Sequence, residues 1–90
     1  MTDQEALALA RNRNADDELL RIIAVRRDWM RSYQVRLALA TNPKTPVVVA
    51  LKQLSSLGDR DLRQLAKSRN VPDAVSAQAR RMVVSHSGPG

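Results

Sequence analysis

Three segments of the chain that open with a Leu-Ala pair align without gaps, and this repetition constrains the fold more than any other feature. The segments begin at Leu9, Leu39 and Leu65, so that successive copies lie 30 and 26 residues apart. In each copy the pair is followed by basic, Asn, Ser or Pro residues and then by a second apolar segment. Such a spacing is typical of α-helical repeats, in which stacked helical pairs bury together an apolar face that one pair cannot bury alone. The sequence therefore predicts stacked copies of one helix-loop-helix unit.

Apolar spacing and capping residues predict an all-α fold with about six helices in a single domain over residues 1–84. The expected helices cover residues 3–13, 16–27, 30–41, 46–57, 59–68 and 72–84. They pair into three units at about 3–27, 30–57 and 59–84, and residues 85–90 are expected to form a flexible tail or linker. With no Phe, one Trp and one Tyr, the core must be mainly aliphatic.

The middle of the chain carries specific boundary signals. Thr45 is well placed to cap a helix that has Pro46 at its first position. The inward face of that helix is expected to comprise Val47, Val48, Leu51 and Leu54. Gly58 fits the C-terminal cap of this helix and Asp59 fits the next N-cap. The extra length between the first two units falls around residues 26–30, where Asp28-Trp29 is expected to break or bend the chain path.

This organisation resembles the HEAT-like α-solenoids. The Asn-Pro-Lys-Thr-Pro loop at 42–46, which closes one helix and opens another, is similar to the leucine-rich variant repeats of bacteria. The resemblance covers roughly residues 5–84, although the second helices align less well, with Arg21 opposite Leu51 and Ala77. It implies a module that binds a partner through the surface that its repeats create.

A second motif competes for the C-terminal unit. Residues 65–76 also resemble a helix-turn-helix, whose second helix enters the DNA major groove. In that family the turn normally holds Gly where Asn70 stands, and the inward Val lies ten residues after the helix-closing Ala, whereas Val75 lies nine residues after Ala66. The other two copies have the same nine-residue separation, which favours the repeat. A DNA-binding domain that uses residues 59–84 is the alternative.

The charge of the chain is unevenly distributed. Residues 1–20 hold five acidic and two basic residues, whereas residues 21–90 hold four acidic and thirteen basic residues, and the formal net charge is +6. This asymmetry favours an anionic partner, such as nucleic acid, an acidic protein surface or anionic lipid.

Aligned loop positions of a stacked repeat line one edge of the molecule, and here several of these positions are basic. The expected basic ridge comprises Arg11, Arg13, Lys44, Lys67 and Arg69. Such a ridge can bind phosphates in a salt-sensitive way. The competing interpretation is that Lys and Arg near helix C-termini complement the helix dipole.

A second basic cluster surrounds the single Trp of the chain. Arg26 and Arg27 precede Trp29 closely in the sequence. A Trp among cations suits a platform on which a nucleobase stacks. A lone Trp at a helix junction is also typical of a packing wedge, which is the interpretation that we favour here.

The sequence contains little that indicates catalysis. The absence of Cys excludes disulfides, thiolate zinc sites and cysteine nucleophiles. The single His, His86, falls in the expected tail, and the acidic residues at 16–18 and 59–61 are explained as helix N-termini. No Gly-rich phosphate loop, metal-ligand spacing or nucleophile elbow is present. We therefore expect a non-enzymatic protein that needs no cofactor and no metal ion.

The ends of the chain bear on location and assembly. The first twenty residues are too acidic for a signal peptide, and the longest apolar run, residues 47–51, is too short to span a bilayer. We expect a cytoplasmic protein whose partner is another protein, with nucleic acid as the alternative partner. Because the last helix is expected to cap the stack, we expect a monomer, with end-to-end dimerisation as the alternative.

Overall fold

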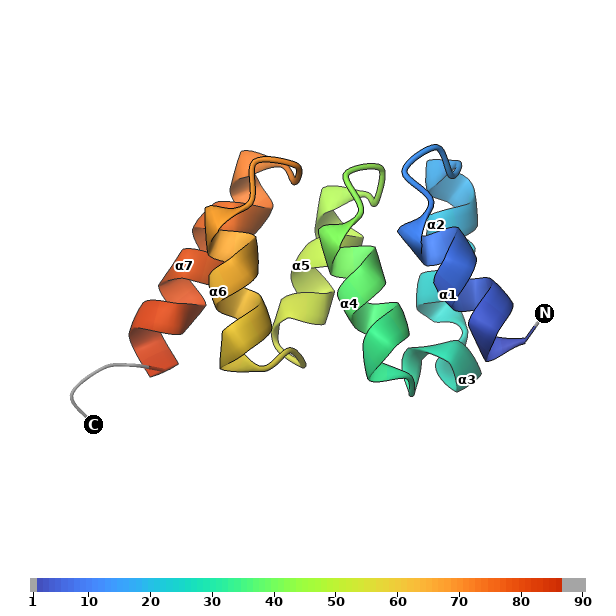
Figure 1. Cartoon of the computed structure of the whole chain (residues 1–90), viewed down its shortest axis with the longest axis horizontal. Helices are drawn as coiled ribbons and strands as arrows, with labels where there is room; N and C mark the ends of the chain where they lie inside the picture. The colour runs from blue at the N-terminus through green and yellow to red at the C-terminus, as the bar shows by residue number, and fades with distance from the viewer. Residues whose placement is uncertain (1, 87–90) are drawn as a thin grey trace.

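Residues 2–86, the part of the chain that the computed structural model describes, fold into seven helices and contain no strand (Figure 1). The helices are α1 (Asp3–Arg11), α2 (Asp17–Val25), α3 (Arg27–Met30), α4 (Tyr33–Thr41), α5 (Val47–Leu54), α6 (Asp59–Lys67) and α7 (Asp73–His86). None of these helices is long and apolar enough to cross a membrane. The all-α fold predicted from the sequence is confirmed.

The three helical pairs have matching bounds. The first helices, α1, α4 and α6, are each nine residues long and start 30 and 26 residues apart, as the aligned Leu-Ala pairs do. Loops of equal length follow at 12–16, 42–46 and 68–72 and lead into the second helices, α2, α5 and α7. Figure 1 shows the three loops at the same end of their helical pairs, along one long edge of a molecule that measures 44 × 23 × 17 Å.

The three loops share one turn. The side-chain oxygen of the first loop residue accepts a hydrogen bond from the backbone N–H two residues later, at 2.9 Å in Asn12, 2.9 Å in Asn42 and 3.2 Å in Ser68. Asn and Ser suit this position because their short polar side chains can replace a backbone acceptor in a tight turn. The fourth loop residue is buried in each copy, as Ala15, Thr45 and Val71.

The core is divided by α4. Val35, Ala38 and Leu39 pack into an aliphatic cluster with α1, α2 and Trp29. Ala40 belongs to a second cluster that α5, α6 and α7 complete, and Leu37 packs against that cluster. Because α4 is covered on two sides, its sequence is apolar over most of its circumference, unlike a helix at the edge of a bundle.

A buried amide joins the first two pairs at their loop end. Asn42 is almost fully buried, and its Nδ2 donates hydrogen bonds to the backbone oxygens of Ala10, at 2.7 Å, and Asn12, at 2.9 Å. These carbonyls lie at the C-terminal end of α1, where helical hydrogen bonding runs out. The side chain of one loop therefore caps the helix of the preceding pair.

A phenol joins the second and third pairs at the opposite end. The hydroxyl of Tyr33, at the start of α4, donates a hydrogen bond to the carboxylate of Asp61 in α6 and accepts one from the backbone N–H of Gly58 at 3.0 Å. The bond to Asp61 is the main cause that raises the pKa of Tyr33 above its ordinary value, since ionisation would place two negative charges together. The guanidinium of Arg36 lies 5.7 Å from the centre of the Tyr33 ring.

The junction between the first two pairs differs from the sequence-based expectation. Residues 27–30 form the short helix α3 where only a break was expected, and α4 starts at Tyr33 with Ser32 as its N-cap. Trp29 is 7% exposed and belongs to the first core cluster. The interpretation of this Trp as a packing wedge is confirmed.

The expectations for α5 were partly wrong. Pro46, and not Thr45, is the N-cap, and the hydroxyl of Thr45 is buried without a partner in the described residues. Val47 is 36% exposed and Val48 is 65% exposed, so that neither faces inward, while Leu54 is fully buried. Val47 and Val48 lie at the surface beside α2, which the apolar run alone cannot indicate.

Two further helix boundaries differ from those expected from the sequence. Gly58 has a φ of −74° and is the N-cap of α6, so it does not form the left-handed cap expected at the end of α5. Helix α7 continues to His86, which places Ser85 and His86 in a helix and not in the expected tail. The rest of that tail, residues 87–90, lies outside the described residues.

Replacing Asn42 by Ser should destabilise the protein by about 1–3 kcal/mol, because Ser keeps the turn, as Ser68 does, but cannot reach the carbonyl oxygens of Ala10 and Asn12. Asn12→Ser is the matched control, since the exposed Asn12 side chain makes only the turn bond. Urea unfolding of both variants measures the difference. Equal losses in the two variants would show that the link between the pairs contributes nothing.

Tyr33 should make stability fall at high pH. Its pKa is raised in the folded protein, so the unfolded chain loses this proton first, and the stabilisation is complete below pH about 10 and lost as pH rises further. The free-energy difference between wild type and Tyr33→Phe, measured by urea unfolding from pH 7 to 11, should therefore shrink above pH 10. A constant difference would contradict the assigned hydrogen bond.

Candidate interaction surface

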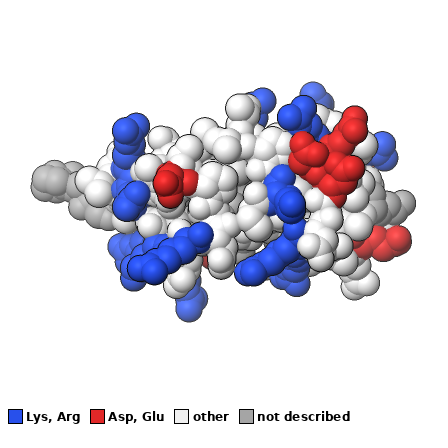
Figure 2. Space-filling view, turned by 90° about the horizontal axis from the view of Figure 1, so that it is seen from above, with Lys and Arg blue, Asp and Glu red and all other residues white. Residues whose placement is uncertain are grey.

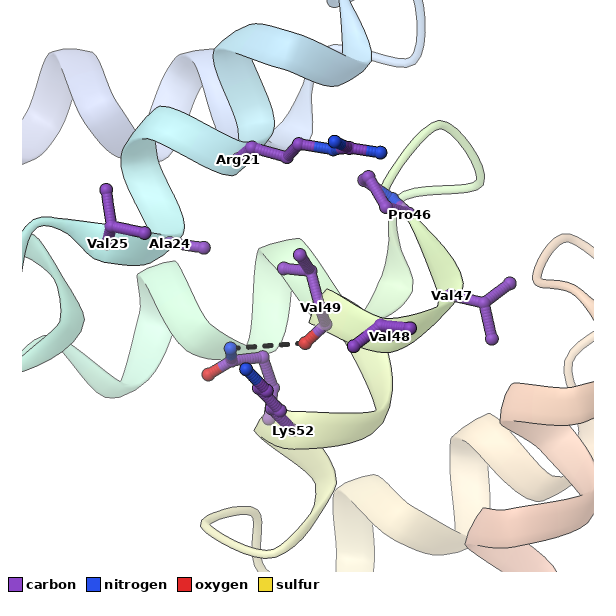
Figure 3. A pocket seen from close by; sticks show the side chains of 9 residues that line it. Arg21, Ala24, Val25, Pro46, Val47, Val48, Val49 and Lys52 are labelled. Atoms are coloured by element: carbon purple, nitrogen blue, oxygen red, sulfur yellow. Dashed lines mark hydrogen bonds between the residues drawn. The ribbon is translucent and has the colours of Figure 1, made fainter.

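A groove of about 610 Å³ separates the second helices of the first two pairs (Figure 3). Arg21, Ala24 and Val25 of α2 form one wall, and residues 46–49 with Lys52 and Gln53 form the other. The groove exists because α2 packs against α1, α3 and α4, while α5 packs against α4 and α7. The two helices therefore share α4 as a support without closing on each other.

The groove is apolar at its centre and basic at its rim. Val25 is 77% exposed, and with Val47 and Val48 it forms an apolar surface that core packing leaves uncovered. Gln53 is buried, and its Nε2 donates a hydrogen bond to the backbone oxygen of Val49 at 3.2 Å within the same helix. In Figure 3, Arg21 extends toward Pro46 on one side, and Lys52 lies at the opposite side. Exposed apolar side chains gathered around a hollow are typical of interaction sites.

Most residues of the basic ridge line three hollows at the loop end, two of which adjoin at Thr41 and Ser68. Arg11 and Arg13 line one of about 250 Å³ with the loop residues Asn42 and Asn70. Lys44 lines another with Asp16 and Asp17, and Lys67 lines a third with Thr41 and Gln64. Arg69 is exposed on the third loop.

Acidic side chains interrupt the positive surface at the loop end. Figure 2, which views this end, shows separate groups of Lys and Arg and an acidic patch over the first pair, where Asp16, Asp17 and Glu18 begin α2. The backbone N–H of Glu18 donates to Asp16 at 3.0 Å and holds the pKa of that carboxyl below its ordinary value. The patch is therefore negative at neutral pH and faces Lys44 across a hollow.

The cluster around Trp29 is arranged differently from a stacking platform. The guanidinium of Arg26 lies 4.8 Å from the centre of the indole ring, within range of a cation–π interaction. Since Trp29 is buried, its ring offers no open face for a nucleobase. Arg27 begins α3 and is exposed beside it.

The start of α7 is half covered. Val75 and Ser76 are buried, whereas Asp73 and Ala74 are exposed, and the helix packs against α5 and α6. A recognition helix needs its first turns free to enter the major groove. Here the exposed part of the first turn carries a carboxylate, which phosphates would repel.

No protein-family model, no curated protein and no solved structure matches this chain. Within residues 2–86, no group of three or more His, Asp or Glu side chains is arranged to hold a metal ion.

Val48 should tolerate substitution far better than its apolar character suggests. Val48→Asp is expected to change the free energy of unfolding by less than about 1 kcal/mol, since the side chain is mostly in water. Leu54→Ala on the same helix should cost about 2–5 kcal/mol, because Leu54 is fully buried. Urea unfolding compares the two, and a large loss in Val48→Asp would contradict the exposed groove.

Proposed function

We propose that the chain is a non-enzymatic, HEAT-like α-helical repeat module that binds a protein partner in the groove between α2 and α5. The observation that carries this proposal is the exposed apolar surface of Val25, Val47 and Val48 around a hollow. The repeat assignment is supported by three helical pairs with matching helix bounds, loop lengths and turn bonds.

The groove suits an amphipathic helix. Its volume of about 610 Å³ falls in the range of sites that enclose a ligand, and its valines offer contacts without hydrogen-bonding groups. A helix that binds in a groove inserts apolar residues spaced three or four apart and leaves its own backbone hydrogen bonds intact. An extended strand would instead need backbone donors and acceptors, and the walls here are mostly aliphatic.

The charges beside the groove indicate what kind of helix it would bind. Arg21 and Lys52 line the groove on opposite sides, and no carboxylate in the described residues lines it. An incoming helix with Glu or Asp beside its apolar stripe therefore meets complementary charge on both sides. The net charge of +6 adds long-range attraction for such a partner.

DNA binding through residues 59–84 and the basic loops is the alternative function. The exposed Arg69 and the hollow that joins Arg11 to Arg13 support it. The half-buried start of α7 and the acidic patch at the loop end favour the protein partner.

Two designed peptides with the same Leu stripe, one flanked by Glu and one by Lys, test the proposal. Fluorescence anisotropy at about 50 and about 200 mM salt should show binding of the Glu peptide that weakens with salt, and little binding of the Lys peptide. Val48→Asp should reduce the affinity for the Glu peptide about tenfold or more, because it places a carboxylate among the apolar anchors.

Charge-reversal variants identify the surface that binds. The double variant Arg21→Glu/Lys52→Glu should reverse the preference toward the Lys peptide. The matched control Arg60→Glu/Arg63→Glu carries the same charge change on exposed residues of α6 and should keep the wild-type preference. Equal binding of both peptides, or equal loss in the control, would reject the groove. A labelled DNA duplex that binds tightly and is released by Lys44→Glu and Arg69→Glu would support the alternative.

A further inference from the structure

A second depression lies on the layer formed by α1, α4 and α6, where polar side chains surround carbon atoms of residues such as Leu37, Ala38 and Leu65. Three adjoining hollows of about 200, 250 and 290 Å³ all include Thr41, near the end of α4. The first extends along the helices to Asp61, and the second opens at the loops beside Asn70. They arise because α4 packs closely on α1, while α6 packs mainly on α7.

The side chains that line this depression offer the hydrogen-bond donors and acceptors that a polypeptide backbone needs. Gln34 near the start of α4, Gln64 of α6 and Thr41 at the end of α4 all line the first hollow. A side-chain amide offers both a donor and an acceptor, which is what the N–H and C=O of an extended chain require. Both Gln side chains are exposed, and the Oε1 of Gln34 accepts a long hydrogen bond from Nη2 of Arg11 at 3.4 Å, which leaves the amide N–H groups of Gln34 to donate. The hydroxyl of Thr41, which donates to the Leu37 oxygen at 3.0 Å, still has lone pairs that can accept.

Positive charge gathers at the loop end of the depression. Arg11 and Arg13 line the hollow there, and Lys67 lines the hollow next to it. No carboxylate of the described residues lines either of these two hollows. The one carboxylate of the depression, Asp61, lies in the third hollow and already accepts the hydroxyl of Tyr33.

We propose that this depression binds an extended acidic peptide, with an oxyanion of the peptide held by Arg11 and Arg13 and its backbone lying across Gln34 and Gln64. The inference concerns a surface separate from the α2–α5 groove and does not depend on the function proposed for that groove. Arg side chains suit carboxylate and phosphate alike, because their donors form parallel pairs of hydrogen bonds with either group.

Size and charge favour a peptide over the other anionic ligands. Each hollow is smaller than the roughly 300–1,000 Å³ of a small-molecule site, so a chain that crosses all three fits better than a compact molecule. A nucleic acid that followed the loop edge would meet the acidic patch of Asp16, Asp17 and Glu18 (Figure 2). A peptide that is held by a single oxyanion at its end does not extend as far as that patch.

The test uses three labelled Gly/Ser peptides that differ at one terminal position, which is phosphoserine, Glu or Ser. Two-dimensional NMR titration of the labelled protein should show binding of the phosphoserine and Glu peptides, with shifts centred on Thr41 and Gln64, and about tenfold weaker binding of the Ser peptide. Inorganic phosphate alone should bind more weakly than the phosphoserine peptide. Phosphate that binds equally well would reject the peptide groove.

Matched variants locate the site. Arg11→Glu/Arg13→Glu should weaken binding of the phosphoserine peptide about tenfold or more. Thr41→Trp should block this binding, because the larger side chain fills the centre of the depression. Arg80→Glu/Arg81→Glu, an equal charge change on exposed residues of α7, should leave binding unchanged. Thermal unfolding confirms that each variant is folded.

Two further outcomes separate this proposal from its rivals. Val48→Asp in the α2–α5 groove should not change the binding of these peptides. A failure of the peptide site can therefore be distinguished from a failure of the proposed function. Equal loss in the Arg80→Glu/Arg81→Glu control, or a DNA duplex that displaces the peptide and binds more tightly, would overturn the peptide site.

Discussion

The register of the first two helical pairs depends on the buried side chain of Asn42. One amide donates to two backbone oxygens at the end of α1, and its own oxygen accepts the N–H of Lys44 at 2.9 Å. It therefore stabilises a helix terminus, a turn and the contact between the pairs together. This bond network holds the first two loops beside each other, and the second of these loops ends at Pro46, which lines the α2–α5 groove.

The two junctions between the helical pairs open on different layers because of the way in which the helices pack. The first junction is closed where α1 meets α4, which leaves α2 and α5 apart; the second is closed where α5 meets α7, which leaves α4 and α6 with little mutual contact. Helix α4 contributes residues to both core clusters. With only nine residues, it cannot also fill the space between α2 and α5 and the space beside α6. The α2–α5 groove and the depression around Thr41 are thus two results of one arrangement.

The limits of sequence analysis follow from the same packing. The apolar spacing and the capping and turn residues predicted an all-α fold with about six helices, because caps and turns are local interactions. Helix α3 was missed because four residues are too few to show a periodicity. The run at 47–49 predicts an apolar helix, but which valines face the core depends on where α4 and α7 lie. Aligned basic residues could be placed at the loop end, whereas the groove depends on the separation of α2 from α5, which no local signal encodes.

The charges near the α2–α5 groove also set the direction in which an acidic helix would lie. Asp17 is four residues before Arg21, so the two side chains share one face of α2 and the positive field of Arg21 is partly cancelled toward the loop end. Lys52 lies toward the other end of α5, in its last turn, where no acidic residue of α5 opposes it. Within a Debye length of about 8 Å at physiological salt, the attraction is therefore strongest near Lys52. We expect the most acidic turn of a bound helix to lie there, away from the acidic patch that begins α2.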